Sequence, residues 1–242
     1  IPLKCFVNKK LEKTLVFLSD KVNTYVYLPS VIKNNYKNII KKYLEDIIQK
    51  YKIKGFVISN LSNLKFLEGY KSNFEIIGNS SLNIFNNYSI KECAEYGINK
   101  VTLSRELSKT ELEDIIKYNL DIDTELIVYG TLPIMSCNYC FLGKSNMCYP
   151  ECKRLCSDDN SYYLKDRLGF KFRLVSDNIQ SIPSIFNSKI LSISPKTFNV
   201  SSVRIDILDE NVTTINKIIE TVKSGKSFEG KEYTSGRLEE EK

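Results

Sequence analysis

A regular alternation of strand-like and helix-like segments constrains the fold of this chain most strongly. Short runs rich in β-branched and aromatic residues predict eight strands, at residues 3–7, 24–28, 55–59, 74–77, 100–103, 125–129, 190–193 and 202–207. Helical spacing of apolar residues predicts helices between most of them, at residues 32–51, 61–68, 90–96, 109–118 and 212–222. This order predicts an α/β fold, a TIM-like (β/α)₈ barrel, with a doubly wound sheet as the second choice.

Two of the predicted helices carry a capping box at their first turn. Ser108 is followed by Glu111, and Ser89 by Glu92, at the spacing with which a serine and a glutamate satisfy the first free amides of a helix. We therefore expect helices to begin directly after Ser108 and Ser89.

The alternation is interrupted at residues 131–188. This stretch contains a cysteine-rich loop and a predicted β-hairpin that turns near Leu168 and Gly169. It follows the strand at residues 125–129, and the carboxyl ends of barrel strands are where active sites lie. We therefore interpret residues 1–242 as a single barrel domain with residues 131–188 inserted near the functional end.

Five of the seven cysteines lie within or next to this loop: Cys137, Cys140, Cys148, Cys152 and Cys156. Thiolates are soft ligands that select zinc, copper(I) or iron–sulfur clusters. A helical turn would place the sulfurs of Cys152 and Cys156 on one face, because the two residues are four apart. The other two cysteines, Cys5 and Cys93, are interpreted as small buried hydrophobic residues.

The chain contains no histidine. Ser-His-Asp and Cys-His catalytic groups and the H-E-x-x-H zinc site therefore cannot be built from this chain alone. Carboxylate acid–base chemistry, lysine or tyrosine as proton carriers, and a metal held by sulfur and oxygen remain.

The net charge of +6 arises from 35 Lys and Arg against 29 Asp and Glu. It is compatible with RNA as a partner, although the lysines of residues 34–52 fit the solvated face of an amphipathic helix better than a nucleic-acid groove. No apolar run approaches the roughly 18 residues of a membrane span. The first residues also lack the order of a signal peptide. The sequence therefore predicts a cytoplasmic protein with no membrane contact.

A series of motifs connects the chain to a known family. In order, they are G-N-S-S-L-N-I-F-N-N-Y-S, V-T-L-S-R-E-L, E-L-I-V-Y-G-T-L-P-I-M, N-Y-C-F-L-G, C-K-R-L-C, Y-Y-L-K-D-R-L-G-F-K-F, I-F-N-S-K-I-L-S-I, V-R-I-D-I-L-D-E and E-Y-T-S-G-R. This set resembles the collagenase-like peptidase family of unassigned catalytic type, in particular the closing barrel segment of its long members. The resemblance implies that the chain is the C-terminal part of a longer protein, whose N-terminal remainder is then a partner.

The resemblance also implies a cofactor. The founding members were described as collagen-degrading peptidases, whereas better understood relatives are oxygen-independent hydroxylases of RNA bases or quinone precursors that carry a four-iron four-sulfur cluster. By position, Cys140 matches the first ligand, and Cys152 and Cys156 match the C-x-x-x-C pair. The family's fourth cysteine has no counterpart here, so Cys148 is the substitute and Cys137 the alternate. A tetrahedral zinc site or a loop without metal is the alternative.

Polar residues near the predicted strand ends are candidates for catalysis or binding. Asp166 and Arg167 are adjacent in a predicted strand and should point to opposite faces, whereas Arg204 and Asp206 alternate onto one face, as an interior salt bridge or as substrate ligands. The resemblance implies a role for Glu125. The candidates for substrate binding are Asn79, Asn83, Tyr129 and Tyr163.

Three classes of function remain. The first is an iron–sulfur-dependent enzyme that hydroxylates tRNA or rRNA, or the C-terminal domain of one. The second is a peptidase, as the family's name says. The third is a non-catalytic structural or zinc-binding module of a larger enzyme. The cysteines favour the first, and the lack of histidine speaks against the second.

Overall fold

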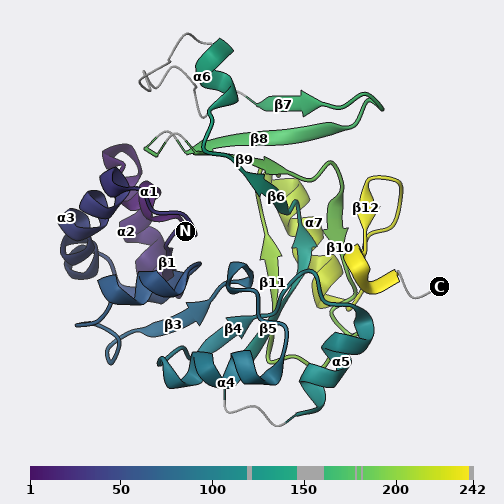
Figure 1. Ribbon diagram of the computed structural model, residues 1–242, viewed down its shortest axis with the longest axis horizontal. Coiled ribbons are helices and arrows are strands. Elements are labelled where there is room, and N and C mark those ends of the chain that lie inside the picture. The colour runs from purple at the N-terminus through teal and green to yellow at the C-terminus, as the bar shows by residue number, and fades with distance from the viewer. Residues whose placement is uncertain (119–121, 146–160, 178, 181, 240–242) are drawn as a thin grey trace. The chain divides into compact units, whose positions relative to one another are not determined.

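The structure is a computed structural model that describes residues 1–118, 122–145, 161–177, 179–180 and 182–239 (Figure 1). The chain divides into two compact units. The first unit comprises Ile1–Ile127, Phe198–Val203 and Arg237–Lys242, and the second comprises Val128–Thr197 and Arg204–Gly236.

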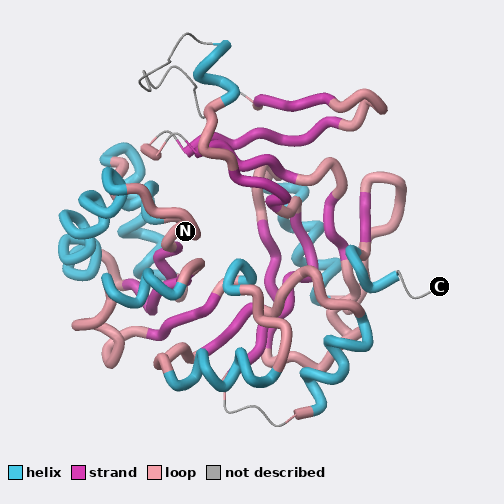
Figure 2. Tube along the Cα trace, viewed as in Figure 1, coloured by secondary structure: helices cyan, strands magenta, loops and turns pink. Residues whose placement is uncertain are grey.

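The first unit is built on a parallel sheet in which neighbours in the chain are neighbours in the sheet. Its strands are β1 (Thr24–Tyr27), β2 (Ile53–Ile58), β3 (Glu75–Gly78), β4 (Lys100–Thr102) and β5 (Asp123–Gly130), which continues into the second unit. The helical connections are α3 (Asn34–Lys50), η2 (Leu61–Phe66), η3 (Ser80–Leu82), α4 (Asn87–Glu95) and α5 (Lys109–Lys117). Figure 2 shows this alternation of strand and helix. A crossover after each strand is what keeps the next one parallel.

Side chains on β2, β3 and β4 form the centre of this unit's core. Phe56, Ile76 and Val101 are fully buried. The backbones of β2 and β3 approach each other so closely that a Cβ on Gly55 would lie 1.9 Å from the carbonyl oxygen of Glu75. Position 55 therefore requires glycine, because any side chain would push the two strands apart.

The start of the chain differs from the sequence prediction. Residues 3–7, predicted as a strand, form the short helix α1 (Leu3–Phe6), followed by η1 (Lys9–Leu11) and α2 (Glu12–Lys21). Leu3 and Phe6 are both buried. Residues three apart share a face only in a helix, so their burial explains why the strand prediction was wrong.

The two capping predictions have opposite outcomes. The capping box of Ser108 and Glu111 is present at the start of α5. The prediction at Ser89 was wrong, because α4 begins three residues earlier, at Asn87. Its N-cap is Asn86, whose Oδ1 accepts a hydrogen bond from the backbone N–H of Ser89 at 2.9 Å. Asparagine caps a helix as well as serine does.

The second unit contains the end of β5, two further strands and the end of a third, whose first residues belong to the first unit. β10 (Ile190–Ser192) pairs antiparallel with β5 and parallel with β12 (Tyr233–Thr234), and β11 (Ser202–Asp206) also pairs with β5. The helix α7 (Val212–Lys223) and the short η4 (Gly236–Glu239) belong to the last part of the chain.

A separate four-stranded antiparallel sheet lies within residues 131–188. Its order is β6 (Pro133–Ser136), β9 (Ile182–Phe186), β8 (Lys171–Asp177) and β7 (Tyr162–Lys165). The short helix α6 (Phe141–Ser145) follows β6. β7 and β8 form the hairpin that the sequence predicts, with Gly169 at φ +91° in its turn. Leu174 in β8 pairs with Ile185 in β9, and both side chains are buried at the centre of the four-stranded sheet.

The structure therefore shows a mixed α/β fold with a mostly parallel central sheet. The described strands do not show a closed barrel, so the (β/α)₈ architecture stays a prediction. Of the helices in the described part of the chain, none combines the length and the apolar composition that a membrane-spanning segment requires.

Candidate functional site

Two of the loop cysteines lie at the edge of the antiparallel sheet. Cys137 directly follows β6, and its backbone N–H donates to the carbonyl oxygen of Pro183 at 3.0 Å, which extends the pairing with β9. Cys140 directly precedes α6. Both thiols are free and half-buried. The other three candidate ligands, at positions 148, 152 and 156, lie outside the described residues.

The sulfur of Cys140 occupies a polar position at the start of α6. The backbone N–H of Gly143 lies 3.2 Å from Cys140 Sγ and 3.1 Å from the Cys140 carbonyl oxygen. Amide donors directed at sulfur are one of the features with which proteins tune the thiolate ligands of iron–sulfur clusters. In this respect Cys140 fits a thiolate-ligated group. Within the described residues, no group of three or more Cys, Asp or Glu could hold a metal ion, but this part of the chain contains only two of the five thiols.

The remaining cysteines differ from each other in burial. Cys93 is 4% exposed, and burial, with a smaller contribution from the neighbouring Glu92 carboxylate, raises the pKa of its thiol. Its interpretation as a small buried hydrophobic residue is confirmed. Cys5 is half-buried.

Glu125 belongs to a group of polar side chains on the parallel sheet of the first unit. Its Oε1 accepts a hydrogen bond from the Thr102 hydroxyl at 2.9 Å. In the same sheet, the Tyr25 hydroxyl donates to Glu75 Oε2 at 2.6 Å. Burial raises the pKa of Tyr25, and the carboxylates of Glu75 and Glu125 raise it further. Both carboxylates therefore act on one phenol, which stays protonated and serves as a donor.

Sequence analysis named Glu125 in this group and missed its neighbours. Tyr25 and Glu75 lie within segments that were predicted as strands, and Tyr25 pairs with Gly55, which pairs with Glu75. Residues in register across a sheet share a face. A polar residue at a half-buried position of each of these strands was the available signal, but it identifies a group only when the register is known.

Asn79 is the centre of a second polar group, at the carboxyl ends of β1, β2 and β3. Its Nδ2 lies 3.2 Å from the Tyr27 hydroxyl, 3.2 Å from Ser59 Oγ and 3.3 Å from Ser81 Oγ. Asn79 is 6% exposed. The carboxyl ends of the strands are where ligands bind to parallel sheets, and this position of Asn79 agrees with a role in substrate binding. That role stays a prediction. Asn83 is exposed and ends η3 in a left-handed conformation (φ 55°), which asparagine adopts more readily than most residues.

Tyr129 is buried in an aromatic cluster of the second unit. Its ring meets Phe228 edge-on, with 5.7 Å between centroids, and Phe228 stacks on Tyr233 at 5.4 Å. Burial raises the pKa of Tyr129 to about 12, with smaller contributions from Glu210 and Tyr233. The side chain therefore stabilises the core, and its role in binding stays a prediction.

Asp166 and Arg167 do not lie in a strand, so the prediction of their opposite orientation was wrong. β7 ends at Lys165, and both residues belong to the hairpin turn. Asp166 Oδ1 accepts hydrogen bonds from the backbone N–H of Leu168 at 2.9 Å and of Phe170 at 2.8 Å. An aspartate that binds backbone amides two and four residues on stabilises a turn, which explains why β7 stops before it.

Arg204 and Asp206 share a face of β11, as their spacing predicts. Arg204 Nε donates to Asp206 Oδ1 at 2.5 Å, and their side chains are 24% and 27% exposed. The backbone of Asp206 passes so close to Gly130 that a Cβ at position 130 would lie 2.6 Å from the Asp206 carbonyl oxygen. Whether the ion pair contacts a substrate stays a prediction.

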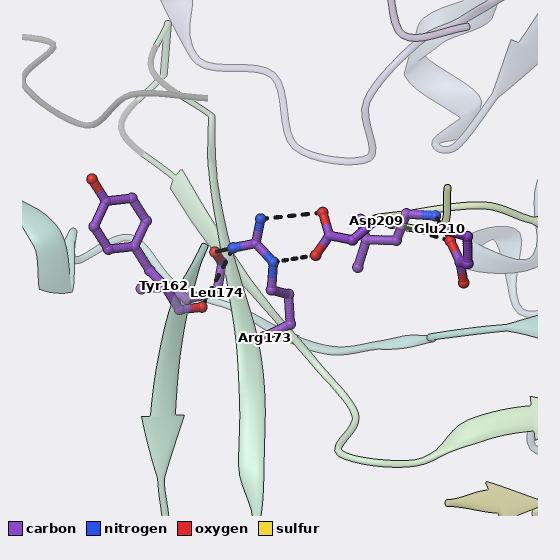
Figure 3. Close-up of polar contacts among 6 residues, drawn as sticks. Tyr162, Arg173, Leu174, Asp209 and Glu210 are labelled. Atoms are coloured by element: carbon purple, nitrogen blue, oxygen red, sulfur yellow. Dashed lines mark hydrogen bonds and ion pairs between the residues drawn. The ribbon is translucent and has the colours of Figure 1, made fainter. Parts of the chain in front are cut away.

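Figure 3 shows an ion pair that sequence analysis missed. Arg173 in β8 makes two contacts with Asp209, from Nε to Oδ2 and from Nη2 to Oδ1. Its Nη1 donates to the carbonyl oxygen of Leu174 at 2.6 Å and reaches that of Tyr162 at 3.4 Å. The guanidinium carbon also lies 5.7 Å from the ring centroid of Tyr163. Arg173 therefore connects the hairpin to the segment after β11 and contacts the exposed Tyr163 ring.

A comparison with known protein families agrees with the motifs. The sequence profile of peptidase family U32 matches residues 3–193. The chain therefore belongs to peptidase family U32, which confirms the resemblance drawn from the motifs. Among solved structures, the chain is similar to the U32 peptidase Mk0906, with 8% sequence identity and a TM-score of 0.49 over 84% of this chain and 77% of that chain. No curated protein matches the sequence.

Proposed function

We propose that this member of peptidase family U32 is an iron–sulfur-dependent enzyme that hydroxylates bases of tRNA or rRNA, or is the C-terminal domain of such an enzyme. In this proposal Cys140, Cys148, Cys152 and Cys156 are the metal ligands, with Cys137 as the alternate. The cluster, when bound, supplies electron transfer.

The observation that best supports the proposal is the position of Cys140. Its thiol is half-buried, unpaired with another cysteine, and accepts an amide hydrogen bond at the start of α6. A cysteine that is paired in a disulfide or packed in the apolar core would not be available as a metal ligand. The continued backbone pairing at Cys137 anchors the start of the same loop on a four-stranded sheet.

The proposal extends to the fold and to the location of the protein. The parallel βα order of the first unit supports a (β/α)₈ barrel, the common scaffold for sites at the carboxyl ends of strands. A tRNA- or rRNA-modifying enzyme would also act in the cytoplasm.

The product of the reaction gives the test. Anaerobically purified protein is incubated with unmodified tRNA or rRNA and a two-electron acceptor, so that water supplies the oxygen atom and the acceptor takes the two electrons. The nucleosides are then analysed by mass spectrometry. We expect one nucleoside to gain the mass of one oxygen atom with the wild type. Cys140→Ser should abolish this product, while Cys5→Ser, a matched control outside the loop, should retain it. Undiminished hydroxylation by the Cys140 variant would refute the role of this ligand.

The family description favours peptidase activity as the second candidate. Without histidine, a carboxylate acid–base pair such as Glu75 and Glu125, whose carboxylates both act on Tyr25, is one means by which the chain could hydrolyse a peptide. Digestion of gelatin and casein tests this candidate. Cleavage that is lost in Glu125→Gln and retained in Cys140→Ser would support the peptidase and contradict the hydroxylase.

A zinc-binding module is the third candidate. It predicts about one zinc per chain, no visible absorbance, and neither of the two activities.

A further inference from the structure

The β7–β8 hairpin presents a basic surface with one exposed aromatic ring. Tyr163 pairs directly with Arg173, and Lys165 pairs directly with Lys171. Residues two apart in a strand and opposite each other across a pair lie on one face. Tyr163, Lys165, Lys171 and Arg173 therefore share a face, and Arg167 lies in the adjoining turn. We call these five residues the hairpin face.

The charges of Lys165, Arg167 and Lys171 are poorly compensated within the protein, whereas Arg173 is paired with Asp209. Like charges directly opposite each other destabilise a strand pair, yet Lys165 faces Lys171. Among the described residues, no salt bridge joins Lys165, Arg167 or Lys171 to an acidic side chain. The nearest carboxylate in the chain, Asp166, is occupied by the backbone amides of the turn. An external polyanion would relieve this repulsion.

Tyr163 combines an exposed ring with a neighbouring cation, the two features that a stacking platform needs. Its side chain is 52% exposed, and the Arg173 guanidinium lies over its ring. Arg173 is itself fixed by Asp209 and by the carbonyl oxygens of Leu174 and Tyr162 (Figure 3). A ring that is already ordered loses little conformational freedom when a base stacks on it. Aromatic side chains beside a positive surface are the common means of holding single-stranded nucleic acid.

We infer that the hairpin face binds single-stranded RNA, with one base stacked on Tyr163 and the flanking phosphates on Lys165 and Lys171. This inference rests on the proposed function and names the surface that holds its substrate. The hairpin belongs to the same four-stranded sheet, ordered β6-β9-β8-β7, whose pairing Cys137 extends. RNA on the hairpin would therefore be held by the sheet that also anchors the start of the cysteine loop.

The hairpin tip carries two exposed apolar residues, Leu168 and Phe170, at 77% and 47% exposure. A basic hairpin with an apolar tip could also contact an anionic membrane. The ordered stacking ring on the hairpin face favours RNA, because a membrane surface needs no such platform. Binding to anionic vesicles in place of RNA is therefore the competing outcome of the experiment below.

The test is the affinity of the full chain for a labelled single-stranded RNA of about 20 nucleotides, measured by fluorescence anisotropy between 50 and 200 mM salt. The variant Lys165→Gln with Lys171→Gln should weaken binding about tenfold at low salt. It should also reduce the slope of log affinity against log salt by about 1.4, since each phosphate contact to a single strand contributes about 0.7. Tyr163→Leu should weaken binding about tenfold and leave the slope unchanged.

The control is Lys13→Gln with Lys91→Gln, two exposed lysines of α2 and α4 whose loss changes the net charge equally. We expect this control to bind RNA within about twofold of the wild type. The inference is overturned if the control and the hairpin variant lose affinity equally. It is also overturned if the hairpin variants bind RNA as the wild type does but no longer bind vesicles containing phosphatidylserine.

The hydroxylation assay separates failure of this inference from failure of the proposed function. Hairpin variants that bind and hydroxylate RNA like the wild type would overturn the inference alone. A protein that binds RNA through the hairpin face but yields no hydroxylated nucleoside would keep the inference and overturn the proposed function.

Discussion

The ion pair of Arg173 and Asp209 gives a prediction whose size follows from the structure. Two guanidinium nitrogens of Arg173 contact the two carboxylate oxygens of Asp209. The side chain of Arg173 is 12% exposed and that of Asp209 is 46% exposed. Fully exposed pairs contribute about 0.2–1 kcal/mol, whereas breaking a buried pair costs about 3–5 kcal/mol. Because Arg173 is mostly covered and Asp209 is exposed, we expect a coupling free energy of about 1–2 kcal/mol, between the values for exposed and buried pairs.

A double-mutant cycle measures this coupling. Arg173→Met keeps the apolar stem and Asp209→Asn keeps the shape, so each removes the charge with little change in volume. Urea unfolding followed by circular dichroism gives the free energy of unfolding of the wild type, both single variants and the double variant. Arg173→Met should be the more destabilising single change, because it also loses the contacts with the carbonyl oxygens of Leu174 and Tyr162. In thermal unfolding, the coupling corresponds to about 2–8 °C.

The exposed pair of Lys52 and Asp20, at 81% and 42% exposure, is the matched control. Its own cycle should show coupling within the error of the measurement. Single effects of Arg173→Met and Asp209→Asn that add within about 0.5 kcal/mol would refute the reasoning, since independent sites behave in this way.

Three further predictions concern single residues. Gly130→Ala should destabilise the protein by about 1–3 kcal/mol in urea unfolding, because a Cβ there would collide with the backbone of β11. The control Gly69→Ala, with open space around it, should change the stability little, and equal effects of the two substitutions would contradict the geometry. Burial raises the pKa of Tyr129 to about 12, so the contribution of the protonated phenol to stability should be full below about pH 10 and lost as the pH rises towards 12. Tyr129→Phe should remove this pH-dependent loss of stability, and a Tyr129→Phe profile identical to that of the wild type would exclude Tyr129 as its cause. At pH 8, alkylation followed by mass spectrometry should label Cys140 in the metal-free protein and leave the buried Cys93 unmodified, and rapid labelling of both would disprove the difference in burial.

The sequence was sufficient to predict the elements whose side chains repeat with a clear period. The parallel strands of the first unit and the helix after Ser108 are examples, because alternation and capping are local properties. Residues 3–7 were misassigned because a short apolar run fits either structure until its buried partners are known. The hairpin turn was predicted near Leu168 and Gly169, but Asp166 and Arg167 were wrongly placed in the strand, because the hydrogen bonds from Leu168 and Phe170 to Asp166 override the strand pattern.

The candidate site was less predictable, since it depends on contacts between distant residues. The group of Tyr25, Glu75 and Glu125 forms only when the register of the sheet is set, and a single sequence does not give that register. Arg173 and Asp209 are 36 residues apart. The cysteines, in contrast, identify themselves by their density in the chain, while the amide contact of Cys140 is visible only in the structure.

Iron and acid-labile sulfide analysis of the anaerobically purified protein tests the central claim most directly. The account predicts about four iron and about four sulfide per chain with broad visible absorbance, lost in Cys140→Ser and retained in Cys93→Ser. One zinc per chain, or iron content that Cys140→Ser leaves unchanged, would contradict it.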